Sequence, residues 1–97
     1  MVQTVKSIIV AAGEKIILFE KPYILKRVFF SVKNISAAYD WFPSKISFDD
    51  PLFTSFYLGG GTEKYFEARG EDISQGNIWL LNDSSHGMWF AATEILR

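Results

Sequence analysis

The sequence predicts a single all-β domain, an antiparallel β-sandwich of about eight strands that spans residues 1–97. Three observations lead to this prediction. β-Branched and aromatic residues recur in short runs, and turn-forming residues separate these runs at intervals of roughly 8–12 residues. The chain has 97 residues, which fits one domain. It also contains no internal repeat, linker or low-complexity tract that would divide it.

The expected strands follow one another with only short breaks. In chain order they are Val2–Val10, Glu14–Phe19, Ile24–Lys33, Ala38–Trp41, Lys45–Phe48, Leu52–Leu58, Lys64–Ala68, Ile78–Leu81 and Trp89–Leu96. Ala38–Trp41 has the weakest strand pattern of these segments, so we expect eight strands. The breaks contain glycine, proline, asparagine, aspartate and serine, which are the usual turn residues. We expect the run Gly59-Gly60-Gly61 to be a flexible hairpin connection.

The first expected strand superficially resembles a secretion signal, because Lys6 precedes a short apolar run and small residues that end at Gly13. The apolar run is too short for a signal, and more strand-like sequence follows it directly. We therefore expect a strand here. No run in the chain approaches the roughly 18 apolar residues of a membrane-spanning helix.

Side chains alternate between the two faces of a strand, so each expected strand can be divided into two sets. In Ile24–Lys33, one set is apolar apart from Lys26, and the other set, which includes Arg27 and Phe29, is mixed. In the last strand, Met88, Phe90, Ala92, Glu94 and Leu96 oppose Trp89, Ala91, Thr93 and Ile95. Apolar residues therefore occur on both faces of that strand.

Strands with continuous apolar runs are normally covered on both faces. A two-layer sandwich covers only one face of each sheet, and no helix is expected that would cover the other. We expect another subunit or a partner protein to provide the cover, although single exposed apolar residues are also common. The residues expected at this interface are Phe29, Tyr39, Trp41, Phe42, Trp79, Trp89 and Ile95.

The bunched rings of Tyr39, Trp41 and Phe42 beside Pro43 leave three alternatives open. They could close one end of the sandwich as part of its core, they could bury in a protein interface, or they could stack on sugars.

Composition and charge exclude several classes of function. The chain has no cysteine, so it has neither disulfides nor a thiolate metal site. Its formal net charge is −1 and its lysines and arginines are not clustered, so we expect no nucleic-acid partner. The hydrophobic fraction of 48% and the aromatic fraction of 16% are high for so small a domain, so some rings must lie near the surface.

No motif predicts a reaction or a cofactor. The only histidine, His86, lies in a run of turn residues, and neighbours in one tight turn rarely converge as a catalytic triad. The pair Asp49-Asp50 precedes Pro51 and is expected to form a turn. The glycine run before Thr62 lacks the lysine and hydroxyl ending of a phosphate-binding loop. We expect no enzyme, no metal and no cofactor.

The overall pattern resembles the small, often jelly-roll-like β-sandwich domains that tailed bacteriophages use as capsid decoration proteins, head fibres and adhesion knobs. The features that carry the resemblance are a strand opening after Ala12-Gly13-Glu14, a long strand over 25–34, a central glycine turn and a closing arrangement over 66–70, 76–79 and 89–94. No single motif is matched residue by residue.

The resemblance implies a jelly-roll-like sandwich that acts without catalysis as a homo-oligomer, with a trimer favoured. It also implies a place in the virion, assembled in the host cytoplasm, with partners such as a major capsid protein or a receptor. A carbohydrate-binding module that uses exposed aromatic rings is the alternative. A metal-dependent enzyme of the double-stranded β-helix type is a third hypothesis, disfavoured because such a site usually needs more than one histidine.

Overall fold

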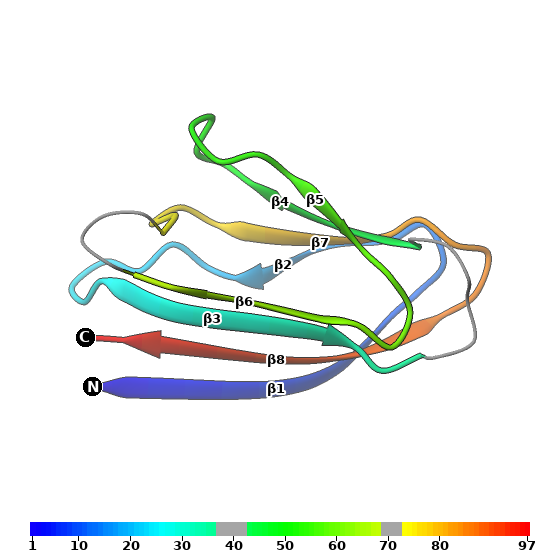
Figure 1. The fold of residues 1–97 in the computed structure, drawn as a ribbon, viewed down its shortest axis with the longest axis horizontal. Helices are drawn as coiled ribbons and strands as arrows, with labels where there is room; N and C mark the ends of the chain where they lie inside the picture. The colour runs from blue at the N-terminus through cyan, green and yellow to red at the C-terminus, as the bar shows by residue number, and fades with distance from the viewer. Residues whose placement is uncertain (37–42, 69–72) are drawn as a thin grey trace.

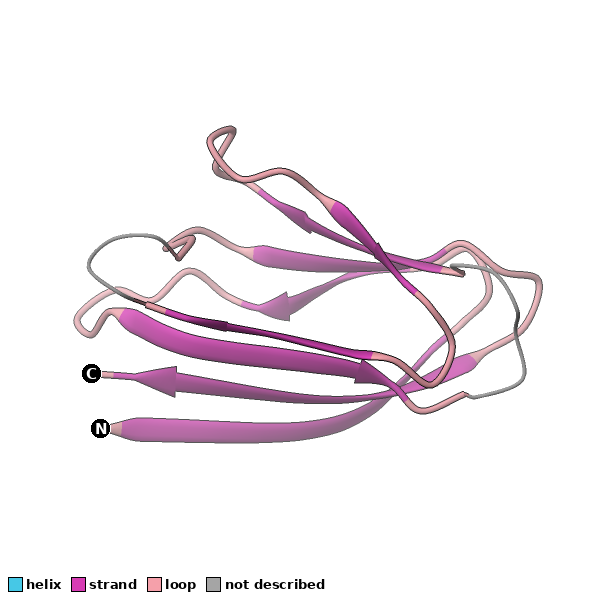
Figure 2. Cartoon of the chain, viewed as in Figure 1, coloured by secondary structure: helices cyan, strands magenta, loops and turns pink. Residues whose placement is uncertain are grey.

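The computed structural model describes residues 1–36, 43–68 and 73–97, and Figures 1 and 2 show that these residues form two layers of strands joined by loops. The eight strands are β1 (Val2–Val10), β2 (Lys15–Phe19), β3 (Arg27–Asn34), β4 (Ser44–Phe48), β5 (Phe56–Leu58), β6 (Glu63–Glu67), β7 (Ile78–Asn82) and β8 (Met88–Leu96). Among these residues, none forms a helix long and apolar enough to cross a membrane.

The strands form two antiparallel sheets of four. The first sheet has the order β1-β8-β3-β6 and the second sheet has the order β2-β7-β4-β5. The chain passes from one sheet to the other at every connection except the one between β4 and β5. This is the strand order of a double Greek-key jelly roll, so the predicted antiparallel β-sandwich of jelly-roll type is confirmed.

The core lies between the two sheets and follows the alternation of the strands. In β8, the residues Met88, Phe90 and Ala92 are buried, whereas Trp89 between them is exposed. The second sheet contributes Ile46, Leu58, Ile78 and Leu80 from its own inner face. Stacked and tilted rings, among them Phe30, Phe48 and Phe66, fill the space near β5 and β6.

Both termini lie at the same end of the sandwich, because β1 and β8 are antiparallel neighbours and Val2 pairs with Leu96 (Figure 1). The β2–β3 and β4–β5 connections lie at this end as well. The β1–β2, β5–β6 and β7–β8 connections lie at the other end.

Two predicted strands begin too early. The segment predicted as Ile24–Lys33 starts only at Arg27, and the side chain of Ile24 is 96% exposed. The chain before Arg27 is a loop, and the backbone carbonyl of Glu20 at its start accepts a hydrogen bond from the Arg27 guanidinium. The segment predicted as Leu52–Leu58 is a strand only from Phe56, since the amide of Leu52 donates to the Asp50 carboxylate in a tight turn.

The glycine run over 59–61 does not connect a hairpin, so that prediction is wrong. β5 pairs with β4 and β6 pairs with β3, so the run carries the chain from the second sheet to the first. Gly61 has a φ of 75°, a left-handed conformation that favours glycine, and its amide donates to the carbonyl of Asn34. The weakest predicted strand, Ala38–Trp41, lies outside the described residues.

Candidate association surface

The outer face of the first sheet consists of the side chains that point away from the core. Its register places them in rows across β1, β8, β3 and β6, such as Val5, Thr93, Ser31 and Tyr65. The complete outer face consists of Gln3, Val5, Ser7, Ile9, Trp89, Ala91, Thr93, Ile95, Phe29, Ser31, Lys33, Glu63, Tyr65 and Glu67. No described helix or loop is packed over it as a third layer (Figure 2).

Charge divides this outer face into two halves. Lys33, Glu63 and Glu67 all lie on β3 and β6. The half formed by β1 and β8, described here over its full length, carries only uncharged side chains. We call these residues the uncharged half-face: Gln3, Val5, Ser7, Ile9, Trp89, Ala91, Thr93 and Ile95.

Large apolar side chains are exposed on the uncharged half-face. Val5 is 70% exposed and Ile9 is 57% exposed on β1, and Trp89, opposite Ile9 on β8, is 50% exposed. Short side chains lie between them, since Ser7 pairs with Ala91 in the next row. A partner could therefore approach the backbone closely while it contacts larger groups at the edges of the face.

The outer face of the second sheet differs, because lysines lie over its aromatic rings. The ammonium of Lys15 is 5.0 Å from the ring centroid of Trp79, and the ammonium of Lys45 is 5.5 Å from that of Tyr57. The indole Nε1 of Trp79 also donates to the Asp49 carboxylate over 2.6 Å. These aromatic rings already have polar partners within the chain, so this face is less suited to association.

The structure brings together three of the predicted interface residues. Phe29 and Ile95 are cross-strand partners on the outer face of the first sheet, and Trp89 lies on the same face further along β8. Phe29 is half-buried and stacks on Tyr65 with centroids 6.5 Å apart. Trp79 lies on the opposite side of the molecule, in the second sheet. Tyr39, Trp41 and Phe42 lie outside the described residues.

Several members of the outer face were not identified from the sequence. Val5 and Ile9 alternate with the inner residues of β1, so strict alternation along Val2–Val10 could have found them. Tyr65 was missed because β6 is short and is otherwise mainly charged on this side.

Arg27 is the main departure from strict alternation. The sequence pattern placed it on the mixed face with Phe29, but its side chain is completely buried. A register irregularity between Arg27 and Phe29, where β3 pairs with β8, turns Arg27 inward. Nothing in the residue types of this segment predicts such a bulge.

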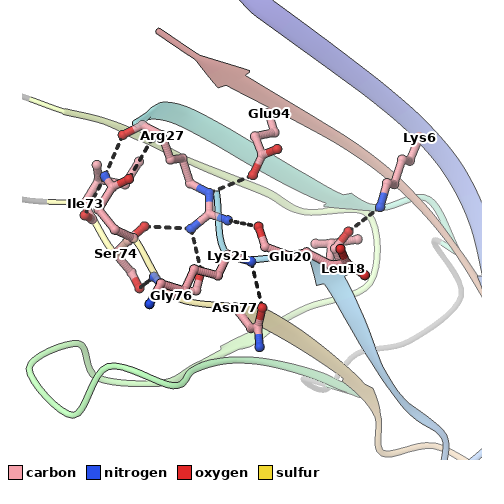
Figure 3. Close-up of polar contacts among 11 residues, drawn as sticks. Lys6, Leu18, Glu20, Lys21, Arg27, Ile73, Ser74, Gly76, Asn77 and Glu94 are labelled. Carbon is pink, nitrogen blue, oxygen red and sulfur yellow. Dashed lines mark hydrogen bonds and ion pairs between the residues drawn. The ribbon is translucent and has the colours of Figure 1, made fainter. Parts of the chain in front are cut away.

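The buried guanidinium links three segments at the end of the sandwich that holds the termini (Figure 3). Its Nε donates to the Glu94 carboxylate over 2.7 Å, and its Nη1 donates to the carbonyls of Ser74 and Gly76. Its Nη2 donates to the carbonyl of Glu20. The arrangement is structural, because the charge is neutralised by Glu94 and its donors are directed at the protein itself.

A pocket of about 300 Å³ opens beside this arginine and is lined by Lys26, Asp50, Leu52, Phe53 and Gln75, among others. In the described part of the chain, every buried side-chain nitrogen or oxygen already has a hydrogen-bond partner. Thus no unsatisfied buried group is directed into the pocket to hold a ligand.

The turn that contains His86 is built from local hydrogen bonds. Asn82 Nδ2 donates to the His86 carbonyl over 2.7 Å, and the Ser84 hydroxyl donates to Asn82 Oδ1 over 2.6 Å. Within residues 1–36, 43–68 and 73–97, histidine, aspartate and glutamate form no group of three or more that could hold a metal ion.

We compared the chain with models of protein families, with curated proteins and with solved structures, and none of the three comparisons gave a match.

Proposed function

We propose that this chain is a non-enzymatic structural protein of a virus particle, a capsid decoration or fibre-type module that works by association. Its partners are other copies of the chain and other virion proteins, such as a major capsid protein. Under this proposal the chain is found in the virion and assembles in the host cytoplasm.

The observation that carries the proposal is the uncharged half-face over β1 and β8, where Val5, Ile9 and Trp89 are exposed together. Contiguous exposed apolar surface on a folded domain is typical of a protein interface. Fully buried centres of interfaces are poor in charged residues and rich in aromatic residues, which fits this composition.

The jelly-roll strand order supports the viral part of the proposal more weakly. Viral capsid domains use this architecture, but lectin domains and cupins use it too. A fold alone does not identify a function, so the viral assignment rests on the resemblance of the whole pattern. That resemblance implies a trimer, whereas the proposed function requires only that copies associate.

Light scattering of the purified chain over a concentration series tests association. We expect a mass above that of the 11.1 kDa monomer. Mass spectrometry of purified particles of the encoding virus tests the virion assignment, and we expect the chain among the particle proteins. A monomer at every concentration that is also missing from the particles would contradict the proposal. Retention on a glycan panel by such a monomer would favour the carbohydrate-binding alternative.

A further inference from the structure

The open edge of the first sheet is formed by β1, which has no neighbouring strand on its outer side among the described residues (Figure 1). We infer that β1 pairs antiparallel with β1 of a second copy, about a two-fold axis at Ser7. The inference rests on the proposed function, since it names a second copy as the partner of β1, the outer strand of the uncharged half-face, and gives the register of the pairing.

The other three sheet edges have features that prevent strand pairing. β6 has charged residues at Glu63, Lys64 and Glu67, and β5 has only three residues. β2 has five residues and a register irregularity between Ile17 and Phe19. Natural proteins protect sheet edges by such charges, short lengths and bulges.

β1 lacks these protective features. It has nine residues, Val2–Val10, and pairs with β8 without any shift of register. It contains no proline, and its one charged side chain, Lys6, points inward. The Lys6 ammonium donates to the carbonyl of Leu18 over 2.6 Å, so it is held between the sheets by its own chain (Figure 3).

The hydrogen-bond pattern identifies which backbone groups face the open edge. The amide of Ile35 donates to the carbonyl of Trp89 over 2.9 Å, so odd-numbered residues of β8 bond toward β3. Even-numbered residues of β8 therefore bond toward β1, where their partners are also even-numbered. The N–H and C=O groups of Gln3, Val5, Ser7 and Ile9 consequently point to the open edge, where they need partners.

A two-fold axis at Ser7 makes this row of groups complementary to itself. Ser7 then lies opposite Ser7 of the second copy, and Val5 lies opposite Ile9 of the second copy, twice in each pair of chains. The exposed β-branched side chains of these two residues become cross-strand neighbours on one face, an arrangement that stabilises sheets. In this register only odd-numbered residues exchange hydrogen bonds, and these are the residues whose N–H and C=O groups point to the open edge.

Of the two neighbouring registers, the one with the axis at Lys6 is disfavoured by charge. It would place Lys6 directly opposite Lys6 of the second copy, and like charges at directly opposed positions destabilise a strand pair. With the axis at Ser7, Lys6 instead lies opposite Ile8 of the second copy. The pairing then joins two uncharged half-faces into one continuous surface over β8, β1 and the same strands of the second copy.

Cysteine cross-linking tests both the edge and the register, because the chain has no cysteine of its own. In an antiparallel bonded pair the Cα atoms are about 5.5 Å apart, within the range of about 4.4–6.8 Å that a disulfide requires. Ser7→Cys should therefore form a covalent dimer when it is oxidised under native conditions. Val5→Cys is the control. In this register the two copies of position 5 lie four residues apart along the paired strands, about 14 Å, so Val5→Cys alone should not cross-link.

The register also predicts a cross-link between two different variants. A mixture of Val5→Cys and Ile9→Cys should give heterodimers, because these positions oppose each other across the axis. Circular dichroism and thermal unfolding confirm that each variant is folded, as expected for changes at exposed positions.

Two results would overturn the inference, and they differ in what they mean for the proposed function. If Ser7→Cys gives no covalent dimer while the unmodified chain forms an oligomer, such as the trimer that the resemblance implies, edge pairing is rejected and association stands. If the unmodified chain is a monomer at every concentration, edge pairing is rejected, and the proposed function is rejected as well if the chain is also missing from the virus particles.

Discussion

The guanidinium of Arg27 donates to the carboxylate of Glu94 over 2.7 Å, across the pairing of β3 with β8. The Arg27 side chain is fully buried and that of Glu94 is 9% exposed. Removal of one charge from such a pair leaves the other without compensation in the interior, whereas the intact pair adds little net stability.

Glu94→Gln should therefore lower the free energy of unfolding by about 3–5 kcal/mol, as for other buried ion pairs that lose one partner. Urea unfolding followed by circular dichroism measures the change. Glu67→Gln is the matched control, because Glu67 is exposed on β6, and its effect should stay within about 0.5 kcal/mol. Equal unfolding midpoints for the two variants would show that the buried pair contributes nothing specific.

Asn82→Ala should lower the free energy of unfolding by about 2 kcal/mol, because it removes a buried hydrogen-bond donor and leaves the carbonyl that it bonds without a partner. Asn82 Nδ2 donates to the carbonyl of Val10 over 2.9 Å and so links β7 to the end of β1. The exposed neighbour Ser85 provides the control as Ser85→Ala. Thermal unfolding of both variants checks the prediction, and a control as unstable as Asn82→Ala would contradict it.

Gly13→Ala should lower the free energy of unfolding by about 1 kcal/mol, because alanine is strained in the left-handed backbone conformation of this position. Gly13 has a φ of 72°, and an added Cβ would meet no atom within 4 Å. Asparagine tolerates this conformation better than alanine, so Gly13→Asn should be less destabilised. Chemical denaturation of the two variants makes the comparison, and the reverse order of stability would argue against backbone strain as the cause.

Association through the uncharged half-face should depend little on ionic strength. Salt screens exposed charges over about 8–10 Å at moderate concentration, but it does not weaken apolar contacts. Sedimentation in 0.1 M and 0.5 M sodium chloride should give the same oligomer mass. Dissociation at the higher salt concentration would instead indicate a charged surface, such as the half over β3 and β6.

The fold was predictable because alternation and turn residues are local signals. Val2–Val10 matches β1 at both ends, since no bulge interrupts its alternation. Arg27 could not be placed, because the irregularity that turns it inward depends on the pairing of β3 with β8. The glycine run over 59–61 was mistaken for a hairpin because a turn residue does not reveal which sheet the next strand joins.

The candidate association surface was only partly predictable for the same reason. Phe29, Trp89 and Ile95 were expected at an interface, and they lie on one face. Trp79 had an equally apolar sequence context, but its strand belongs to the other sheet, where Lys15 and Asp49 contact its ring. Sheet membership and these polar contacts are long-range properties that a single strand pattern does not contain.

The most direct test compares two aromatic residues that are equally exposed on opposite outer faces. Trp89 in the first sheet and Tyr57 in the second sheet are both 50% exposed. Sedimentation analysis of Trp89→Lys and Tyr57→Lys, each checked for a native thermal transition, measures the mass of the assembly. We expect Trp89→Lys to lose the contacts made through the uncharged half-face and to sediment no larger than the dimer that β1 pairing gives, whereas Tyr57→Lys should keep the oligomer of the unmodified chain. An oligomer that survives Trp89→Lys and is lost in Tyr57→Lys would contradict the account.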